Sequence, residues 1–517
     1  MKSKVSTLNR DGRQISPWQR SVKTSIPVMH ANERTVYDVL IVGAGITGLT
    51  AALKLQTAGK RTVVAEAFTI GYGTTGGTSA HINTFADTTY TEAESAFGEE
   101  GAKLFKQAIL DGYHTITDNV AEYKINCDLE TRPGYVYAED DEQEKQLKDL
   151  YDGATKVGVA IEYVNEVPVK VPYQKAVMLD GQAQFDPLKY LSALANEYLK
   201  AGGVILQHTM VNEVQCHEGV HTATTANGTI KASNVIYATH MPPHINVFNM
   251  KCAPYRSYVL GVELVDHEDV PDALIYDLQE PYHYFRSHVV NGQKLLLVGG
   301  NDHKTGHDDP EQAFDDLENY VRQYYNVKSV VYKWSSQYYV PVDGLPYVGQ
   351  MPLQADGTYC ATGYNGNGMM LGSVSGAILA DMILGNENPL TELFNAKRMK
   401  PIDGFTEFIK ENADVAYHFV ADKFKGQHLD SFNELEPGTG KLIDIDGQKL
   451  AAYKDDAGKV HALSPVCTHM GCNVAWNACE KSWDCPCHGA RYDIDGKVVT
   501  GPATKDLEQI ELPETSN

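Results

Sequence analysis

Tyr37-Asp-Val-Leu-Ile-Val-Gly43-Ala-Gly45-Ile-Thr-Gly48 decides the fold of the larger part of this 517-residue chain. An apolar, strand-forming run leads into three glycines and then into a helical pattern over 49–58. Gly43 permits a tight turn, Gly45 lets the backbone approach a phosphate, and Gly48 lets helix and strand pack closely. The N-terminus of the helix supplies unpaired N–H groups and the positive end of its dipole. The stretch predicts a binding turn for a dinucleotide pyrophosphate.

A carboxylate follows the glycine turn at the sequence separation that is typical of a dinucleotide-binding motif. The second predicted strand, 61–65, ends in Glu66, eighteen residues after Gly48, where a ribose-binding carboxylate is expected. A glycine-rich turn without a ligand is the alternative, and Glu66 disfavours it. FAD and NAD share the same ADP half, so this motif does not distinguish them.

Two later segments distinguish the cofactors. Gly71-Tyr-Gly-Thr-Thr-Gly-Gly-Thr-Ser-Ala80 and Ala361-Thr-Gly363-Tyr-Asn-Gly366-Asn-Gly368-Met369 resemble the flavin-contacting segments of the glycine oxidase and D-amino acid oxidase-like family. The resemblance implies FAD, with the first segment around the phosphates and the flavin. The second segment would open a helix over 369–384 whose N-terminus faces the pyrimidine side of the flavin ring and stabilises the anionic reduced form.

Three further stretches carry the same resemblance: 339–349, 209–211 and 235–239. The last two look like strand ends that complete the adenine and pyrophosphate pocket, although His240 stands where relatives usually have glycine. The FAD-binding residues that the resemblance implies are Gly43, Ala44, Gly45, Ile46, Thr47, Gly48, Glu66, Ala67, Gly73, Thr74, Thr75, Thr78, Val211, Ala238, Thr239, Gly363, Gly366, Gly368 and Met369.

A second cofactor site is indicated near the C-terminus. Its first two candidate ligands, Cys467 and His469, form a C-x-H motif. Fifteen residues separate this motif from a C-x-x-H motif that contains the other two, Cys485 and His488. Two thiolates and two imidazoles can hold the two irons of a [2Fe–2S] cluster. A structural zinc site is the alternative, but zinc sites usually separate their cysteines by two to four residues. The spacing therefore predicts one-electron transfer.

The residues around these ligands, Cys467-Thr-His-Met-Gly-Cys472 and Cys485-Pro-Cys-His-Gly489, resemble the Rieske family of the cytochrome bc type, and 501–503 resembles its proline loop. The resemblance implies a Cys472–Cys487 disulfide. Ala490 stands where relatives of higher potential have serine, whereas Tyr492 matches the tyrosine that bonds a ligand sulfur. Fewer donors to sulfur predict a potential in the lower part of the Rieske range.

Together the resemblances cover nearly the whole chain. They imply an α/β FAD-binding Rossmann-like domain interleaved with an α+β antiparallel-sheet substrate domain, followed by an all-β Rieske domain. We expect an N-terminal arm at 1–36, the oxidoreductase at 37–395 with its substrate part mainly at 89–165 and 252–334, a linker at 396–423 and the Rieske domain at 424–517. Apolar periodicity predicts a helix within 93–126 and strands at 176–179, 204–209, 222–225, 257–264 and 295–298, with a hairpin over 448–464 and a polar junction at 410–430.

Composition limits the partners. The net charge of −23 argues against nucleic acid or an anionic membrane, since both would be repelled. No apolar segment is long enough to span a membrane and the N-terminus has no apolar signal region, so we expect a cytoplasmic protein. Five of the nine cysteines lie at 467–487, which is typical of a cofactor cluster and not of a disulfide scaffold. Among these five, Cys479 is expected to be incidental.

Catalytic candidates follow from position. Arg256 and Arg286 lie in predicted strands of the substrate domain and could hold a carboxylate. His81, Tyr364 and Asn365 adjoin the flavin-contacting segments, where packing or capping is at least as plausible as catalysis. The polar run at 302–308 could suggest a mononuclear metal site with two His and one carboxylate. We prefer a loop near the flavin, since glycine and lysine inside the run indicate a turn.

The expected function is oxidation of a small substrate, a C–N bond of an amine or amino acid, by FAD. Electrons would then pass singly through the Rieske cluster to an unidentified external acceptor. One alternative is an electron-transfer reductase that supplies a partner oxygenase, which the single glycine fingerprint disfavours because an NAD(P)H domain is missing. Another is a redox-sensing binding protein.

Overall fold

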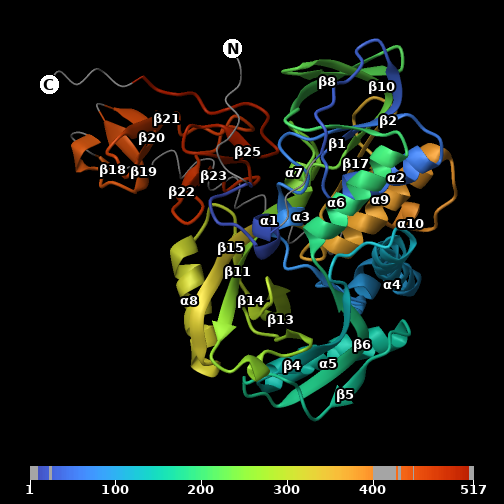
Figure 1. The fold of residues 1–517 in the computed structure, drawn as a ribbon, viewed down its shortest axis with the longest axis vertical. Helices are drawn as coiled ribbons and strands as arrows, with labels where there is room; N and C mark the ends of the chain where they lie inside the picture. Colours follow the sequence, from blue (N-terminus) through green and yellow to red (C-terminus); the bar gives the residue numbers. More distant parts are fainter. Residues whose placement is uncertain (1–9, 22–25, 400–426, 429–431, 446, 512–517) are drawn as a thin grey trace.

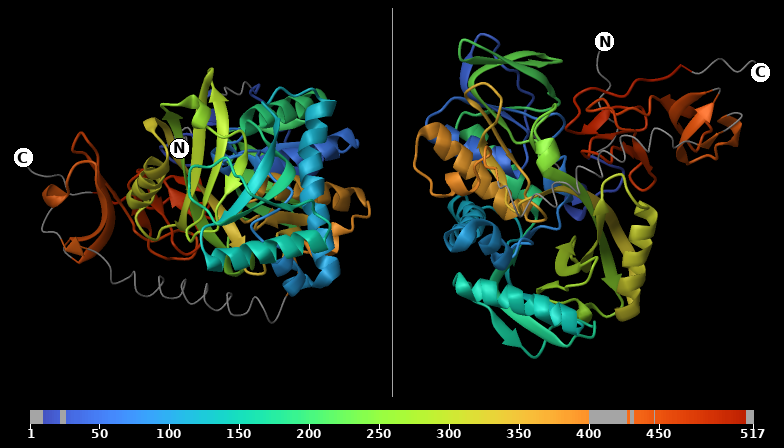
Figure 2. Two further views of the ribbon diagram at one scale, coloured as in Figure 1. Left: turned by 90° about the horizontal axis from the view of Figure 1, so that it is seen from below. Right: turned by 180° about the vertical axis from the view of Figure 1, so that it is seen from behind.

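The computed structural model describes residues 10–21, 26–399, 427–428, 432–445 and 447–511. Two large sheets with their helices make up the part before residue 400, and two small sheets make up the C-terminal part (Figure 1). The C-terminal part lies against one side of the larger body, as Figure 2 shows from two further directions. Most of the predicted junction at 410–430 and most of the predicted linker at 396–423 lie outside the described residues, although 427–428 of the junction are described.

The first sheet contains the glycine turn. Its central strands are parallel, and β16 joins it antiparallel. Strand β1 is apolar on both faces, which is typical of a buried parallel strand. The strand order is β16 (Tyr347–Gln350), β17 (Thr358–Thr362), β10 (Gly228–Tyr237), β1 (Val36–Val42), β2 (Thr62–Ala65) and β7 (Val204–Leu206), with β8 (Val211–His217) and β9 (Val220–Thr225) extending it from β10.

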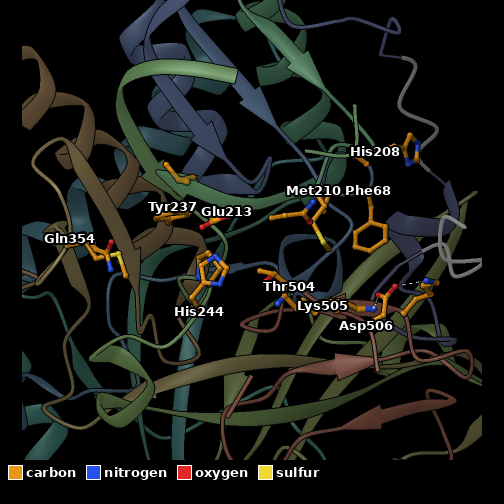
Figure 3. Close-up of a pocket in the computed structure, with 18 residues that line it drawn as sticks. Phe68, His208, Met210, Glu213, Tyr237, His244, Gln354, Thr504, Lys505 and Asp506 are labelled. Carbon is orange, nitrogen blue, oxygen red and sulfur yellow. Dashed lines mark hydrogen bonds and ion pairs between the residues drawn. The ribbon is translucent and has the colours of Figure 1, made fainter. Parts of the chain in front are cut away.

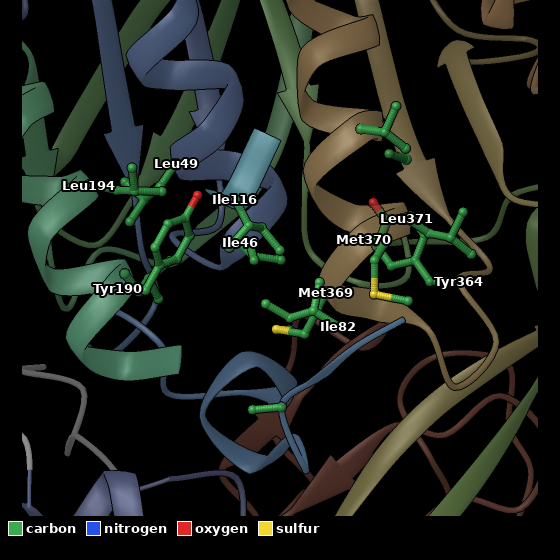
Figure 4. Packing of buried hydrophobic residues seen from close by; sticks show 14 of the residues in the cluster. Ile46, Leu49, Ile82, Ile116, Tyr190, Leu194, Tyr364, Met369, Met370 and Leu371 are labelled. Atoms are coloured by element: carbon green, nitrogen blue, oxygen red, sulfur yellow. The ribbon is translucent and has the colours of Figure 1, made fainter. Parts of the chain in front are cut away.

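Four helices form the core beside this sheet: α2 (Ile46–Thr57), α4 (Tyr90–Glu122), α6 (Pro187–Lys200) and α9 (Gly368–Leu384). Helix α9 packs against both α2 and α4. Two glycines allow this approach: a Cβ on Gly376 would lie 2.5 Å from the Thr47 carbonyl oxygen, and a Cβ on Gly112 would lie 2.3 Å from that of Met370. Apolar side chains of these helices fill the space between them (Figure 4). The helices predicted at 49–58, 93–126 and 369–384 are confirmed.

The second sheet is largely antiparallel. Its order is β15 (Val327–Pro341), β11 (Cys252–Leu264), β14 (Gln293–Lys304), β13 (His283–Val290), β12 (Leu274–Tyr276), β4 (Glu130–Ala138), β6 (Lys175–Gln184) and β3 (His81–Ile82), with β5 (Glu162–Val164) paired to β6. Helices α8 (Pro310–Tyr324) and α5 (Asp141–Lys156) pack on it. The sheet extends beyond 89–165 and 252–334, because β6 pairs with β4 and β15 runs along the whole of β11.

The C-terminal part has two four-stranded sheets. The first consists of β18 (Gln427–His428), β19 (Gly440–Ile445), β20 (Gln448–Lys454) and β21 (Val460–Leu463), so the predicted hairpin is confirmed as β20–β21. The second consists of β22 (Ala475–Asn477), β23 (Ser482–Asp484), β24 (Arg491–Tyr492) and β25 (Val498–Thr500).

Short helices elsewhere are α1 (Pro17–Ser21), α3 (Thr74–Gly77), α7 (Phe248–Lys251) and α10 (Leu390–Leu393), with 3₁₀ turns η1 (His267–Asp269) and η3 (Phe432–Glu434). In the described ranges, none of the helices combines the length and the apolar character needed to cross a membrane.

A buried ion cluster joins the C-terminal part to the larger body. Glu480, which is fully buried, ion-pairs with Arg10 at 3.0 Å and with Arg256 of β11 at 3.4 Å. The Ser335 hydroxyl of β15 donates to the same carboxylate oxygen at 2.6 Å. Arg491 pairs with Asp484 and Asp11. The N-terminal residues therefore connect both parts, and the cluster contains three cations and three anions: Arg10, Arg256, Arg491, Asp11, Glu480 and Asp484.

Candidate cofactor and substrate sites

The glycine turn after β1 has no room for side chains. Gly43 has a φ of +106°, and a Cβ there would lie 2.5 Å from the Ala238 carbonyl oxygen. A Cβ on Gly48 would lie 2.0 Å from the Gly43 carbonyl oxygen. The turn leads directly into α2, whose positive N-terminal end suits a phosphate; the Ile46 N–H at this end donates to the Thr75 hydroxyl at 3.2 Å. This cradle fits a pyrophosphate.

Glu66 is held at the end of β2. Its carboxylate accepts hydrogen bonds from the N–H of Ala44 at 2.8 Å and the N–H of Phe68 at 3.0 Å. Burial raises the pKa of Glu66, and the backbone donors partly oppose that rise. A carboxylate in this place suits the ribose hydroxyls of an ADP moiety.

A cavity of about 250 Å³ opens over the glycine turn. Sixteen of the nineteen predicted FAD-binding residues line it: Gly43, Gly45, Ile46, Thr47, Glu66, Ala67, Gly73, Thr74, Thr75, Thr78, Val211, Ala238, Thr239, Gly366, Gly368 and Met369. The other three contribute indirectly. Ala44 positions Glu66, Gly48 packs against the turn, and Gly363 takes a φ of +75° beside Pro341. The lining residues and their donors fit FAD.

Sequence reasoning missed two parts of this cavity. His240 lines it, with a φ of +68° that explains why relatives have glycine here and with its Nδ1 3.1 Å from the Thr74 hydroxyl. Burial lowers the pKa of His240 to about 4, against an opposing effect of Asp11. Gly501 and Ala503 of the predicted proline loop also line the cavity, together with the flanking residues Val498, Val499, Thr500 and Thr504. No signal in the sequence indicated that this loop would lie over the FAD cavity.

A smaller cavity of about 90 Å³ adjoins the first and shares Thr74, Thr78, Tyr338, Gly366 and Met369 with it. Its other lining side chains are mainly polar: Ser79, His81, Asn83, Asp87, Ser257, Tyr276, Tyr282, Tyr284, Ser336, Gln337 and Asn367. Because it borders the end of α9 that faces the FAD cavity, it is the candidate substrate site. His81 is the predicted catalytic residue that lies in it.

The remaining predicted catalytic residues lie elsewhere. Tyr364 and Asn365 line the FAD cavity, where the Tyr364 hydroxyl is 3.0 Å from that of Thr47. Arg286 is fully buried and donates to the carbonyl oxygens of Ser79 and Ala80 at 2.7 and 2.9 Å. Arg256 belongs to the buried ion cluster. Neither arginine lines the candidate substrate site, so their placement does not support the predicted carboxylate clamp.

The polar run at 302–308 divides between two places. Asp302 accepts hydrogen bonds from the hydroxyls of Tyr282 and Tyr338, which line the candidate substrate site. The turn that follows packs on the C-terminal part, since a Cβ on Gly306 would lie 2.9 Å from the Pro486 nitrogen. The expected loop near the flavin is therefore also a contact with the cluster-binding loop.

The four predicted cluster ligands converge on two adjacent loops, one after β21 and one between β23 and β24. The rings of His469 and His488 lie 4.9 Å apart, and Cys467 and Cys485 are both buried. The Nδ1 atoms of both histidines are buried without a hydrogen-bond partner among the described residues. Such groups are costly unless a ligand satisfies them. These two imidazole nitrogens without hydrogen-bond partners, beside two buried thiols, fit a [2Fe–2S] cluster that is held by both histidine and cysteine.

The surroundings of the cluster site also agree with the predictions. Cys472 and Cys487 form a disulfide with an S–S distance of 2.06 Å, as predicted. The Tyr492 hydroxyl lies 3.2 Å from the Cys467 sulfur. Cys479 lies apart from the ligands and packs with the core of the second sheet.

The cluster loops are bonded to the larger body. The Tyr339 hydroxyl donates to the His488 carbonyl oxygen at 3.1 Å, and Gln337 Nε2 donates to that of Gly489 at 3.0 Å. His469 Nε2 lies 3.2 Å from the His244 carbonyl oxygen. Beside this contact, a groove of about 870 Å³ runs between the two parts (Figure 3). Phe68, Met210 and His244 line one side of it and Thr504, Lys505 and Asp506 line the other.

Comparison with known families agrees with both sites. Residues 38–382 match the family model of the FAD dependent oxidoreductases, DAO, and residues 427–511 match that of the Rieske [2Fe-2S] domain. The chain belongs to the DAO family of FAD-dependent oxidoreductases. It carries a Rieske domain at its C-terminus, so its cofactors are FAD and a [2Fe–2S] cluster.

One relative matches nearly the whole chain, and two others match about 70% of it. YhfW of Bacillus subtilis strain 168, whose name describes a Rieske 2Fe-2S iron–sulfur protein, is 32% identical over 96% of this chain and 97% of its own. Gamma-glutamylputrescine oxidoreductase of Escherichia coli K12 is 25% identical over 72% of this chain and 89% of its own. The solved structure of glycine oxidase from Geobacillus kaustophilus has the same fold, with a TM-score of 0.59 and 19% identity over 70% of this chain and 99% of that one.

In this DAO-family flavoprotein, the number of hydrogen bonds to the cluster should set its potential. We expect Ala490→Ser to raise the reduction potential by about 60 mV, the one-electron equivalent of one hydrogen bond of about 1.4 kcal/mol. Tyr492→Phe should lower it, because the hydroxyl beside the Cys467 sulfur is lost. Redox titration followed by electron paramagnetic resonance measures both. Shifts of the same sign in both variants would contradict this explanation.

Proposed function

We propose that this enzyme oxidises a C–N bond of a small amine or amino acid and passes the electrons through the Rieske cluster to an external one-electron acceptor. When bound, FAD supplies the two-electron chemistry, accepting the hydride from the carbon beside the nitrogen, and the cluster takes the electrons one at a time. The name of the Escherichia coli relative, which denotes an amine derivative, supports the choice of a C–N bond.

The main support for the proposal is Tyr339, which contacts both cofactor sites. Its ring lies 4.8 Å from that of His240, which lines the FAD cavity. Its hydroxyl donates to the backbone carbonyl of His488, a predicted cluster ligand. Gln337 Nε2 donates to the same hydroxyl at 3.1 Å and holds it in this position. A short chain of bonded and packed groups thus links the FAD cavity to the cluster loop.

Two residues of this link are buried, the third is partly buried, and hydrogen bonds hold all three in place. Tyr339 is 1% exposed and Gln337 is fully buried. His240 is tied to the phosphate-binding segment through the Thr74 hydroxyl, which itself donates to the Gln337 carbonyl oxygen at 3.0 Å. The contacts of these side chains therefore hold the link in one arrangement.

Anaerobic rapid mixing of the holoenzyme with amines and amino acids tests the proposal. A substrate should bleach the flavin first, and the cluster should become reduced afterwards. A cluster that stays oxidised while the flavin is bleached would end the proposal. Rapid flavin reduction by NADH or NADPH would instead favour a reductase that supplies a partner oxygenase.

Tyr339→Phe tests the link itself. We expect flavin bleaching by substrate to keep its rate and the following reduction of the cluster to become slower, because the hydrogen bond to the His488 carbonyl is lost. Tyr332→Phe is the matched control, since Tyr332 lies on the same strand and contacts Arg20 instead. Stopped-flow absorbance at flavin and cluster wavelengths measures both steps. An unchanged second step in Tyr339→Phe would remove Tyr339 from the path.

A further inference from the structure

The candidate substrate site contains no lysine or arginine. Four tyrosines, one histidine and the carboxylate of Asp87 are among its lining residues, all of which lie in the described part of the chain. The carboxylate of an α-amino acid would need a cation or several strong donors when it leaves water for such a cavity. The two arginines of the second sheet that were candidates for this role are used elsewhere.

Two tyrosine oxygens of this site, those of Tyr338 and Tyr282, are left as hydrogen-bond acceptors for a ligand. The Tyr338 hydroxyl donates to Asp302 Oδ2 at 2.8 Å, and the Tyr282 hydroxyl donates to the same atom at 3.3 Å. A phenol has one hydrogen, so each oxygen offers only lone pairs to a ligand. A ligand that contacts these two oxygens therefore brings N–H or O–H donors to them.

His81 offers a further acceptor. The Tyr276 hydroxyl donates to Asn83 Oδ1 at 2.9 Å, so it accepts from His81 Nδ1 at 2.9 Å. This assignment places the proton of His81 on Nδ1 and leaves Nε2 with a lone pair. Nε2 is buried and has no hydrogen-bond partner among the described residues. Burial, together with Arg286, holds the pKa of His81 well below its usual value, so the ring is neutral.

Asp302 lies behind the tyrosines. Its second oxygen, Oδ1, is also buried without a hydrogen-bond partner in the described ranges. Burial raises the pKa of Asp302 to about 7, although hydrogen bonds from Ser257 and Tyr338 oppose the rise. A carboxyl group with a pKa near neutrality is suited to accept a proton from a bound ligand.

We propose, resting on the function proposed above, that the substrate is a primary or secondary amine without a carboxylate on its α-carbon, held through its N–H groups by His81 and Tyr338. The ammonium first gives a proton to the Tyr338 oxygen as the hydroxyl hydrogen moves to Asp302. The α-carbon then loses its hydrogen with the bonding electron pair to FAD, and a C=N bond forms. Water converts the resulting iminium to a carbonyl compound and ammonia or the shorter amine.

Matched pairs of ligands that differ only in the carboxylate test this substrate class: isoamylamine against leucine, and isobutylamine against valine. In anaerobic mixing with the holoenzyme, the amines should bleach the flavin and the amino acids should not. Calorimetry on dithionite-reduced holoenzyme, which cannot oxidise the ligand, should show binding of the amines only. Bleaching by leucine or valine at least as fast as by the amines would overturn the inference and leave the proposed function standing. No bleaching by either kind of ligand would overturn both.

Two variants test the residues. Asp302→Asn and Tyr338→Phe should each lower the limiting rate of flavin reduction by roughly 10²-fold or more, with a smaller rise in the apparent dissociation constant of the amine. The double variant should lose little more than either single one, since the two groups act as a unit. Asp266→Asn, an exposed carboxylate, is the control. Additive losses, or a change in binding alone, would contradict the proton transfer through Tyr338.

Discussion

Cys485→Ser is expected to give a protein whose flavin is still bleached by substrate but which no longer reduces cytochrome c. Cys485 is 1% exposed and lies beside Cys467, so a serine in its place leaves the iron with one thiolate fewer in a site closed to other ligands. The FAD cavity is lined by other residues, and flavin reduction should keep its rate.

Three measurements check this result: iron and sulfide content, the electron paramagnetic resonance of the reduced cluster, and anaerobic flavin bleaching. Cys479→Ser is the matched control, because Cys479 lies in the same domain but packs with the core of the second sheet. The control should keep the cluster and the full activity. Cytochrome c reduction at the wild-type rate by Cys485→Ser would show that electrons leave directly from the flavin.

Glu480→Gln is expected to destabilise the protein by about 3–5 kcal/mol, the usual cost of breaking a buried ion pair. Arg10 and Arg256 lose their shared partner, and the buried ion cluster keeps three cations against two anions. Urea unfolding followed by tryptophan fluorescence measures the loss. Glu508→Gln, an exposed position in the same domain, is the control and should change stability by less than about 0.5 kcal/mol. A Glu480→Gln protein as stable as the control would show that the cluster does not hold the domains together.

The buried ion cluster around Glu480 also makes the stability of the fold depend on pH. Burial alone would raise the pKa of Glu480, but Arg10, Arg256 and Arg491 outweigh burial and lower the pKa from 4.5 to about 2. A lowered pKa means that the folded state prefers the ionised carboxylate. The contribution of Glu480 is therefore complete above pH 4.5 and is lost as the pH falls towards 2, and Glu480→Gln should lack this part of the acid dependence.

The cofactor sites were predictable because their chemistry depends on short local motifs. The glycine turn at Gly43 leaves no space for a side chain, and the spacing of Cys467, His469, Cys485 and His488 limits the metal centre that they can hold. The strands and helices that carry them follow from apolar periodicity. For this reason the motifs alone indicated a dinucleotide and an iron–sulfur cluster, and the family resemblance of two later segments indicated that the dinucleotide is FAD.

The relation between the two cofactor sites and the use of the buried charges were decided by the tertiary structure. Arg256 and Arg286 looked free to bind a substrate carboxylate, but Arg256 pairs with Glu480, 224 residues away, and Arg286 holds the carbonyls of the phosphate-binding segment. Tyr339 reaches the His488 carbonyl across 149 residues. Contacts over such separations depend on how the domains pack. The local spacing of residues does not predict them, because the partner of a buried charge is set by the tertiary fold.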